Sequence, residues 1–285
     1  MTQSVVVQVG QCGNQVGCRF WDLALREHAH VNKKGLYDEA LSSFFRNAVL
    51  VDMEEGVVNE ILQGPLREVF DSTQLLTDVS GSGNNWAVGH MTYGSAYREQ
   101  IVDKLRKAVE HCDCLQCFFL IHSMGGGTGS GLGTRVLSLL EEEFPEVCRI
   151  VTSIYPSAED DVITSPYNSV LAMRELTEHA DCVLPIENQS LVDIVDKIKR
   201  MSHSGKPGLV IKRDSTIISG QGGLSGAEKP FDAMNNIVAN LLLNITSEVA
   251  DCSHLNTAQP SMSVGETTEA AKLMRASAEG METYL

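Results

Sequence analysis

A glycine-rich run at residues 125–133, GGGTGSGLG, is the stretch of this sequence best suited to bind an anion, with six glycines in nine positions. It follows the apolar segment CFFLI at 117–121, which predicts a strand ending just before the run. Glycine at this density lets the backbone approach a ligand closely and present successive N–H groups to it. Thr128 and Ser130 add hydroxyls, and the helix expected next adds its N-terminus. The run is therefore a candidate phosphate loop.

Two familiar phosphate loops do not fit this run. A Walker loop ends in Gly-Lys-Ser/Thr, whereas Leu132 follows Gly131 and no lysine occurs between Lys107 and Lys197. The dinucleotide fingerprint needs glycines at i, i+2 and i+5, and no register of the run provides them. The remaining interpretation is a loop that neutralises phosphates through backbone N–H groups, with a metal ion supplying positive charge.

A second stretch of the same kind, GQCGNQVG at 10–17, follows the first predicted strand and leads into a predicted helix over Cys18–Leu25. Gln11, Asn14 and Gln15 offer amides that both donate and accept hydrogen bonds. We expect this stretch to be a loop on the same edge of the sheet as residues 125–131.

The segment VDMEE places two carboxylates, Asp52 and Glu54, at the end of the second predicted strand. Their i, i+2 spacing lets both face the same way. Hard oxygen ligands beside phosphates suit magnesium, so Asp52 and Glu54 are the candidate metal ligands.

The cluster HCDCLQC raises the alternative of a zinc site at His111, Cys112, Cys114 and Cys117. Its spacing departs from the usual paired pattern, and no second pair with suitable spacing occurs in the sequence. Cys117 also begins an apolar strand and is expected to face the core. We therefore do not predict zinc there. No arrangement of nucleophile and base predicts covalent catalysis, and we assign no catalytic residue.

Alternating strands and helices predict an α/β fold with a mostly parallel, Rossmann-like sheet flanked by helices. The predicted strands are Ser4–Val9, Ala48–Asp52, Leu75–Val79, Cys117–Ser123, Arg149–Tyr155 and Cys182–Ile186. The predicted helices between them include Tyr97–Glu110, Leu132–Glu143 and Ser169–Glu178. Ligands of such folds bind at the carboxyl ends of the strands, where both glycine-rich stretches are expected.

Composition and charge argue against some partners and compartments. The net charge of −15 and the pI near 4.9 argue against nucleic-acid binding. No leader is visible, and no apolar run approaches the ~20 residues of a membrane span. Eight cysteines in such a chain indicate reduced thiols, so we expect a cytoplasmic protein that does not contact membranes.

The strings GQCGNQVG, VDMEEG, SGSGNNWAVGH and GGGTGSG occur in this order, and with them the chain resembles the tubulin family. The segments HCDCLQCFFLIHSM, SIYPSAEDDVITSPYNS and KPFDAMNNIVANLLLN are most similar to the epsilon branch of that family. The resemblance implies GTP or GDP as ligand, with magnesium. It runs from Met1 to about Ser247, with a break where Asn47 meets Ala48 in place of a longer loop.

The resemblance also implies roles for individual residues. Phosphate contacts are implied for Gln11, Cys12, Ser123, Gly126, Gly127, Thr128 and Gly129, and a loop sensing the terminal phosphate for Ser82 and Asn84. Asp52 and Glu54 correspond to positions near magnesium. Asp161 lies in the implied ribose loop, where Ser165 replaces a glutamate common in the family. Asn188 and Asn235 are implied to bind the guanine edge, with Phe231 stacked on the base.

We expect residues 1–247 to form a tubulin-type GTP-binding domain that includes the start of a core helix at 230–247. Residues 202–229 are expected to be a surface excursion. The apolar helix 237–245 is of the kind normally buried between two layers. Residues 248–285, with a capping pair at Ser263 and Glu266, resemble no part of the family and are expected to form a weakly structured tail, as in a truncated product.

The resemblance predicts a cytoskeletal subunit of centrioles and the centrosome whose partners are other tubulin subunits and centriolar proteins. The family's water-activating acidic residue lies beyond the matching part, so weak hydrolysis of GTP is expected. Three alternatives remain: a non-polymerising or unstable fragment, a dinucleotide-dependent metabolic enzyme, and a division GTPase of bacterial type. The failed dinucleotide fingerprint opposes the second alternative, and GQCGNQ at the N-terminus opposes the third.

Overall fold

A six-stranded, entirely parallel sheet forms the centre of the computed structural model, which describes residues 3–31, 48–67, 69–70, 72–157, 162–203 and 231–246. The strand order is β3-β2-β1-β4-β5-β6. The strands are β1 (Gln3–Val9), β2 (Ala48–Asp52), β3 (Leu75–Thr77), β4 (Leu115–Ser123), β5 (Cys148–Tyr155) and β6 (Cys182–Glu187). The predicted α/β class and all six predicted strands are confirmed; β2 has the predicted bounds, and the other strands differ at one end by one or two residues.

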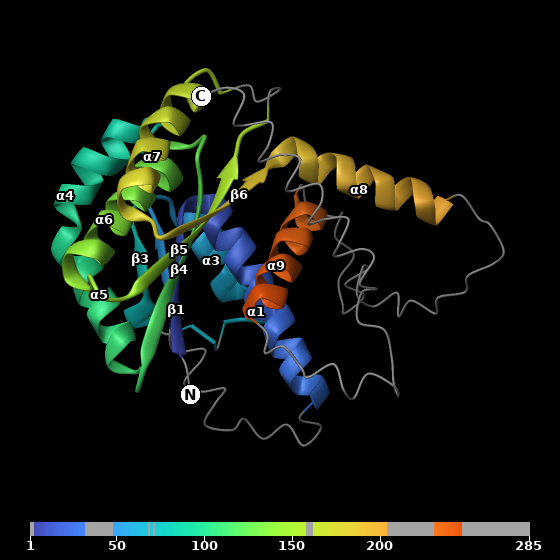
Figure 1. Cartoon of the computed structure of the whole chain (residues 1–285), viewed down its shortest axis with the longest axis horizontal. Helices are drawn as coiled ribbons and strands as arrows, with labels where there is room; N and C mark the ends of the chain where they lie inside the picture. The colour runs from blue at the N-terminus through green and yellow to red at the C-terminus, as the bar shows by residue number, and fades with distance from the viewer. Residues whose placement is uncertain are drawn as a thin grey trace.

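Helices cover both faces of the sheet (Figure 1). One face carries α5 (Arg98–Glu110), α6 (Gly133–Glu143) and α7 (Ser165–His179), together with the short helices η2 (Val88–Tyr93), α4 (Gly94–Ala96) and η3 (Thr128–Leu132). The other face carries α1 (Gly10–Val31), α3 (Glu55–Gln63) and α9 (Asp232–Thr246), with α8 (Asn188–His203) beside β6. A short η1 (Ser72–Gln74) precedes β3. Because side chains alternate along each strand, the sheet separates two apolar cores.

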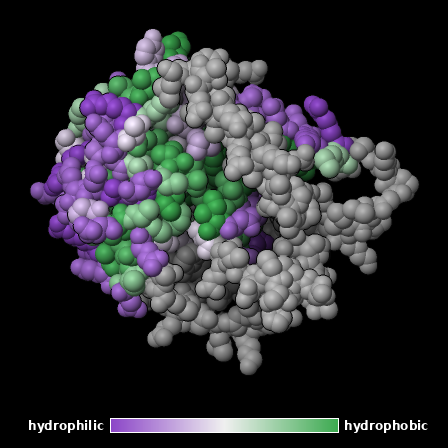
Figure 2. All heavy atoms as spheres, in the orientation of Figure 1, coloured by the Kyte–Doolittle hydropathy of each residue, from purple (hydrophilic) through white to green (hydrophobic). Residues whose placement is uncertain are grey.

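The strand β6 forms one edge of the sheet. Pro185 lies within it, and this placement suits proline because an edge strand needs fewer ladder hydrogen bonds. Figure 2 shows apolar side chains gathered over this edge in the middle of the view, whereas the outer surfaces of α4, α5, α6 and α7 are mostly hydrophilic. Among the described helices, none is long and apolar enough to cross a membrane.

Two predictions of local structure are wrong. Residues 10–17 do not form a loop, because α1 begins at Gly10. The glycine run is also largely helical, since η3 takes up Thr128–Leu132 in a π-helical turn that continues into α6. In both stretches we expected glycine to give the backbone conformational freedom. Instead, the missing side chains allow a helix to pack directly against the backbone of neighbouring segments.

Several predictions lie outside the described residues. These are the excursion beyond residue 203, the two ends of the predicted core helix at 230 and 247, the tail at 248–285 with Ser263 and Glu266, and the break at Asn47.

The helix α9 packs on α1 through three buried residues, Val238, Ala239 and Leu242. Its polar anchor is Asn236, whose side-chain oxygen accepts a 3.0 Å hydrogen bond from Arg19 of α1. The apolar stretch predicted as a core helix therefore contributes to the core on the α1 side of the sheet.

We predict that Leu242→Ala lowers the free energy of unfolding by about 2–5 kcal/mol, because it removes a buried side chain and leaves a cavity that α1 cannot fill. The matched control is Ile245→Ala on the same helix, where 45% exposure of the residue limits the loss to roughly 1 kcal/mol or less. Urea unfolding followed by circular dichroism measures both. Equal effects of the two changes would contradict the packing of α9 described here.

Candidate functional site

The carboxyl ends of β1 and β4 define the candidate site. These strands are neighbours in the sheet. After β1 the chain continues to β2 and β3 on one side, and after β4 it continues to β5 and β6 on the other side, so the segments that follow β1 and β4 diverge. Open parallel sheets bind ligands in the crevice at such a switch point. Gly10 follows β1 with a φ of +75°, and a Cβ there would lie 3.0 Å from the backbone nitrogen of Gly129. The two glycine-rich stretches therefore meet at this point, as predicted.

The glycine run turns most of its residues inward. Of residues 123–131, only Ser123 and Gly126 are partly exposed. A Cβ at Gly126 would meet nothing closer than Ser123 Oγ at 3.8 Å and Asn84 Oδ1 at 3.9 Å. At Gly127 it would lie 2.5 Å from Ser82 Oγ. A ligand can therefore approach Gly126, which is partly exposed, and not Gly127, which is buried.

The loop after β3 lies beside Gly126. Ser82 Oγ lies 2.8 Å from Thr128 Oγ1, so the two hydroxyls hydrogen-bond across the crevice. Asn84 adopts a left-handed conformation with φ of 51°, and its carbonyl accepts a 2.8 Å hydrogen bond from Thr164. Ser82, Asn84, Ser123, Gly126 and Thr128 are thus brought together, as the sequence predicts.

Asn168 on α7 is a positioning residue that the sequence analysis missed. Its side chain is buried and donates to the carbonyls of Gly125 at 2.8 Å and Asn84 at 2.9 Å, while its oxygen accepts from the Trp86 N–H at 2.9 Å. It therefore joins the glycine run to the loop after β3. Ser165, at the start of the same helix, donates to the Gly125 carbonyl over 3.5 Å. The only sequence signal was a polar residue on the apolar side of a helix.

Asp52 closes the site from the end of β2. It is only 3% exposed, and burial raises the pKa of its carboxyl from 3.8 to about 6, against the lowering effect of hydrogen bonds from Glu54, Met53 and Asn14. Its Oδ2 has no hydrogen-bond partner among the described residues. A buried carboxylate oxygen left without a partner fits a metal ligand, so the residues present suit a cation here.

Glu54 and the loop after β3 border an open hollow of about 350 Å³. Glu54 is exposed, and a Cβ at Gly81 would lie 2.8 Å from Glu54 Oε1. The hollow is lined by Glu54, Glu55, Val79, Ser80 and Gly81. The two predicted metal ligands therefore differ in setting, since Asp52 is buried and Glu54 faces solvent.

The remaining predicted contact residues are Gln11, Cys12, Asn188, Phe231, Asn235 and Asp161. Gln11 is exposed in the first turn of α1. Cys12 follows it, and burial raises the pKa of the Cys12 thiol to about 12, so this thiol is protonated at neutral pH. Asn188 begins α8 directly after β6. Phe231 is 55% exposed with a φ of 75°, and its carbonyl accepts a 2.8 Å hydrogen bond from the backbone of Asn235. Asp161 lies outside the described residues.

The comparison with protein families is decisive: a model described as "Tubulin/FtsZ family, GTPase domain" matches residues 3–196. The chain belongs to the tubulin/FtsZ family. It is 68% identical over 280 residues to a tubulin epsilon chain of Homo sapiens and 66% identical to one of Mus musculus. Each match covers 90% of this chain and 59% of the relative. A tubulin beta chain of Encephalitozoon cuniculi is 38% identical over 222 residues, covering 72% of this chain and 50% of the relative.

The predicted resemblance to the tubulin family, and to its epsilon branch in particular, is thereby confirmed. The chain spans 59% of the length of the two tubulin epsilon chains.

We predict that Asp52→Asn stabilises the chain when metal and nucleotide are absent. The folded-state pKa of Asp52, about 6, exceeds the ordinary 3.8, so the folded state binds the proton more tightly and stability falls as pH rises between these values. The variant lacks this penalty. Its gain in unfolding free energy should grow from nearly zero at about pH 4 to roughly 3 kcal/mol above about pH 6.

Urea unfolding across this pH range, in the presence of a chelator, measures the difference. The control is Asp103→Asn, because Asp103 is an exposed residue on α5 far from the site. A gain for Asp52→Asn that is independent of pH would show that Asp52 is not a buried acid of raised pKa.

Proposed function

We propose that this chain binds GTP or GDP together with Mg²⁺ at the carboxyl ends of β1, β2 and β4. The observation that carries the proposal is the partly exposed position of Gly126, beside Ser123 and Asn84, at the switch point of a sheet in a tubulin/FtsZ-family chain. Backbone N–H groups at the start of a helix suit phosphate oxygens. In the described part of the chain, no lysine lies in either glycine-rich stretch to bind the phosphates instead.

The glycine run serves phosphate binding in two ways under this proposal. Ser123 and Gly126 face the ligand, since they alone are partly exposed between residues 123 and 131. Gly127 and Gly129 shape the loop, because a Cβ on either would approach the oxygen of a serine side chain to 2.5 Å. Thr128 is held by Ser82 through a hydrogen bond between their hydroxyls. Gln11 and Cys12, in the first turn of α1, complete the proposed phosphate contacts.

Asp52 and Glu54 are the residues we assign to magnesium. Mg²⁺ binds through one or two carboxylates and keeps several waters, which matches one buried and one exposed carboxylate. When bound, the ion would neutralise charge on the phosphates. The buried Asp52 would hold the ion in place, while Asn14 orients the strand end by donating to the Val51 carbonyl at 3.1 Å.

Guanine recognition is assigned to α8 and α9. The side-chain amides of Asn188 and Asn235 can serve both donors and acceptors on the guanine edge, and the exposed ring of Phe231 offers a stacking face. Asp161 is assigned to the ribose on the family resemblance alone.

Beyond nucleotide binding, we propose a cytoskeletal role, since the relatives are tubulin epsilon chains. On the family resemblance alone, we place this role in centrioles and the centrosome, with tubulin subunits and centriolar proteins as partners. We propose, on the family resemblance alone, that the chain hydrolyses GTP only weakly by itself.

We predict that Gly126→Ala lowers GTP affinity by roughly tenfold or more, about 1.4 kcal/mol, while leaving the unfolding transition of the nucleotide-free chain unchanged. In the free protein the methyl group would make only ordinary contacts, 3.8 Å from Ser123 Oγ and 3.9 Å from Asn84 Oδ1, whereas it would clash with bound phosphate. Gly127→Ala is the matched comparison, since its methyl group collides with Ser82 and the backbone of Asn85 and should destabilise the fold itself. Fluorescent-nucleotide titration and thermal unfolding separate the two effects.

The nucleotide that co-purifies with the full chain provides a direct test. GDP or GTP is expected, and its loss in Gly126→Ala would support the proposed loop. Bound NAD would overturn the proposal in favour of a dinucleotide enzyme. Unchanged GTP affinity in Gly126→Ala would remove the glycine run from the binding site.

A further inference from the structure

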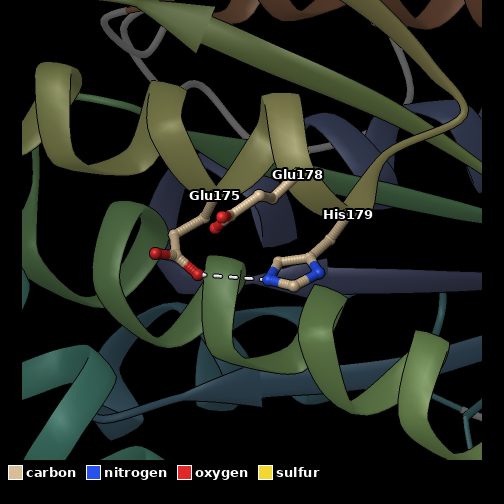
Figure 3. A group of neighbouring side chains, drawn as sticks. All are labelled: Glu175, Glu178 and His179. Carbon is tan, nitrogen blue, oxygen red and sulfur yellow. Dashed lines mark ion pairs between the residues drawn. The ribbon is translucent and has the colours of Figure 1, made fainter.

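A second group of polar side chains lies between α6 and α7, away from the proposed nucleotide site. Glu175, Glu178 and His179 each present one ligand atom, and these atoms lie within 4.8 Å of one another; no other such group of His, Cys, Asp or Glu occurs among the described residues (Figure 3). All three come from α7, at i, i+3 and i+4, so they share one face of the helix.

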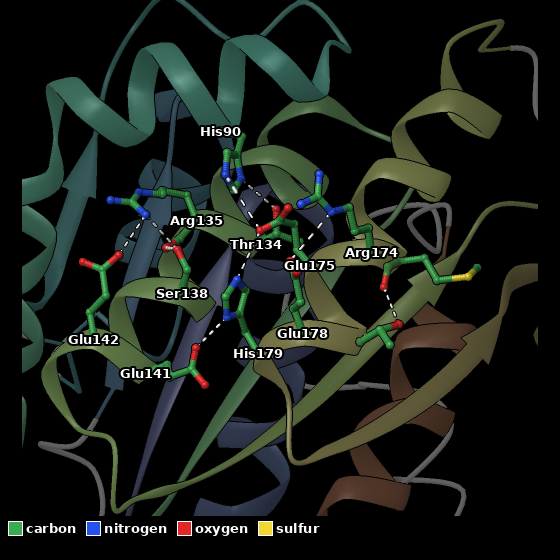
Figure 4. Close-up of polar contacts among 12 residues, drawn as sticks. His90, Thr134, Arg135, Ser138, Glu141, Glu142, Arg174, Glu175, Glu178 and His179 are labelled. Atoms are coloured by element: carbon green, nitrogen blue, oxygen red, sulfur yellow. Dashed lines mark hydrogen bonds and ion pairs between the residues drawn. The ribbon is translucent and has the colours of Figure 1, made fainter.

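The two histidines around Glu175 are oriented alike. His179 Nδ1 lies 2.6 Å from the carboxylate of Glu141, and its Nε2 lies 3.5 Å from Glu175 Oε2. His90 Nδ1 lies 3.1 Å from Thr134 Oγ1 and 3.2 Å from the Gly131 carbonyl, and its Nε2 lies 4.0 Å from the same Glu175 oxygen (Figure 4). Each ring thus has Nδ1 engaged by an outer acceptor and turns Nε2 inward, as metal-binding histidines do.

Glu175 itself has no hydrogen bond to any described residue, although it is only 9% exposed. Its distances to the two Nε2 atoms, 3.5 and 4.0 Å, exceed the usual length of an N–H···O hydrogen bond. They approach the roughly 3.3 Å that separates two ligands of one tetrahedral zinc ion with bonds near 2.0–2.1 Å. The carboxylate of Glu175 therefore forms ion pairs with two imidazole nitrogens at distances longer than hydrogen bonds.

We propose that Glu175, Glu178 and His179 bind Zn²⁺, with Glu141 positioning His179 and water completing the coordination. Imidazole nitrogen with carboxylate oxygen suits zinc, whereas Mg²⁺ prefers oxygen ligands alone. Glu178 is exposed on the solvent side and gives the ion a route of entry. Arg174, 3.7 Å from Glu178, is exposed and forms only a surface ion pair that zinc would displace at little cost.

A zinc ion here would strengthen the contact between α6 and α7. Glu175, Glu178 and His179 lie on α7, and Glu141, the partner of His179, lies on α6. The proposed site is therefore structural: it fixes α7 to α6, the helix into which the glycine run continues.

The test is Zn²⁺ titration of the metal-stripped full chain in competition with a chromophoric chelator, with Co²⁺ as a spectroscopic probe. We expect one ion per chain, a tetrahedral Co²⁺ spectrum without thiolate charge-transfer bands, and a higher unfolding temperature with zinc. His179→Gln should abolish the spectrum. Glu141→Gln should weaken binding by roughly 10- to 100-fold, because it removes the outer partner of His179.

The matched control is Glu142→Gln, since this neighbour of Glu141 pairs with Arg98 and Arg135 and does not reach the cluster. It should leave zinc affinity unchanged. Cys114→Ser tests binding by the exposed thiol of the HCDCLQC cluster and should also have no effect. If His179→Gln does not fold, the exposed Glu178→Gln decides, with at least a tenfold loss expected. Binding that is absent, or that survives both the His179 and Glu178 changes, would overturn the proposal.

Discussion

The backbone contact between Gly10 and Gly129 is the constraint on which the site depends. Two chain segments leave the neighbouring strands β1 and β4 at the same point, and both must continue as helices without a side chain between them. A Cβ at Gly10 would lie 3.0 Å from the Gly129 nitrogen, and one at Gly129 would lie 2.5 Å from Ser123 Oγ. With both side chains absent, η3 lies directly against the start of α1. Thr128 then reaches Ser82, and the carbonyl of Gly125 faces Asn168.

Two buried titratable groups flank this contact and respond to pH in opposite directions. Burial raises the pKa of Asp52 to about 6 and lowers the pKa of His122 from 6.5 to about 4. The neutral His122 contributes stability that is complete above about pH 6.5 and is lost as pH falls toward 4, whereas Asp52 lowers stability as pH rises through nearly the same range. Because the shifts are similar in size, the two effects largely cancel.

The sequence allowed the sheet to be predicted because its strands are nearly unbroken apolar runs, as in β2, where all five residues are buried. The prediction failed at residues 10–17 and 128–132 because glycine was interpreted as a sign of loop. In the structure, Gly13 lets α1 approach the carbonyl of Ile121, and Gly17 makes room for the buried side chain of Gln8. Glycine there reflects how closely neighbours pack, which depends on segments distant in sequence. Asn168 was missed for the same reason, since its partners lie 43 and 84 positions away.

The charges around the proposed site explain why a cation matters more here than in a lysine-containing phosphate loop. Among the described residues, the crevice is bordered by hydroxyls, amides and backbone, while Asp52 and Glu54 add negative charge. Phosphates and carboxylates would repel each other without an ion between them. The burial that raises the pKa of Asp52 also means that a cation binding there relieves an existing penalty. Metal and nucleotide are therefore expected to bind with positive coupling: the ion would reduce the repulsion between the carboxylates and the phosphates, and the phosphates would raise the affinity for the ion.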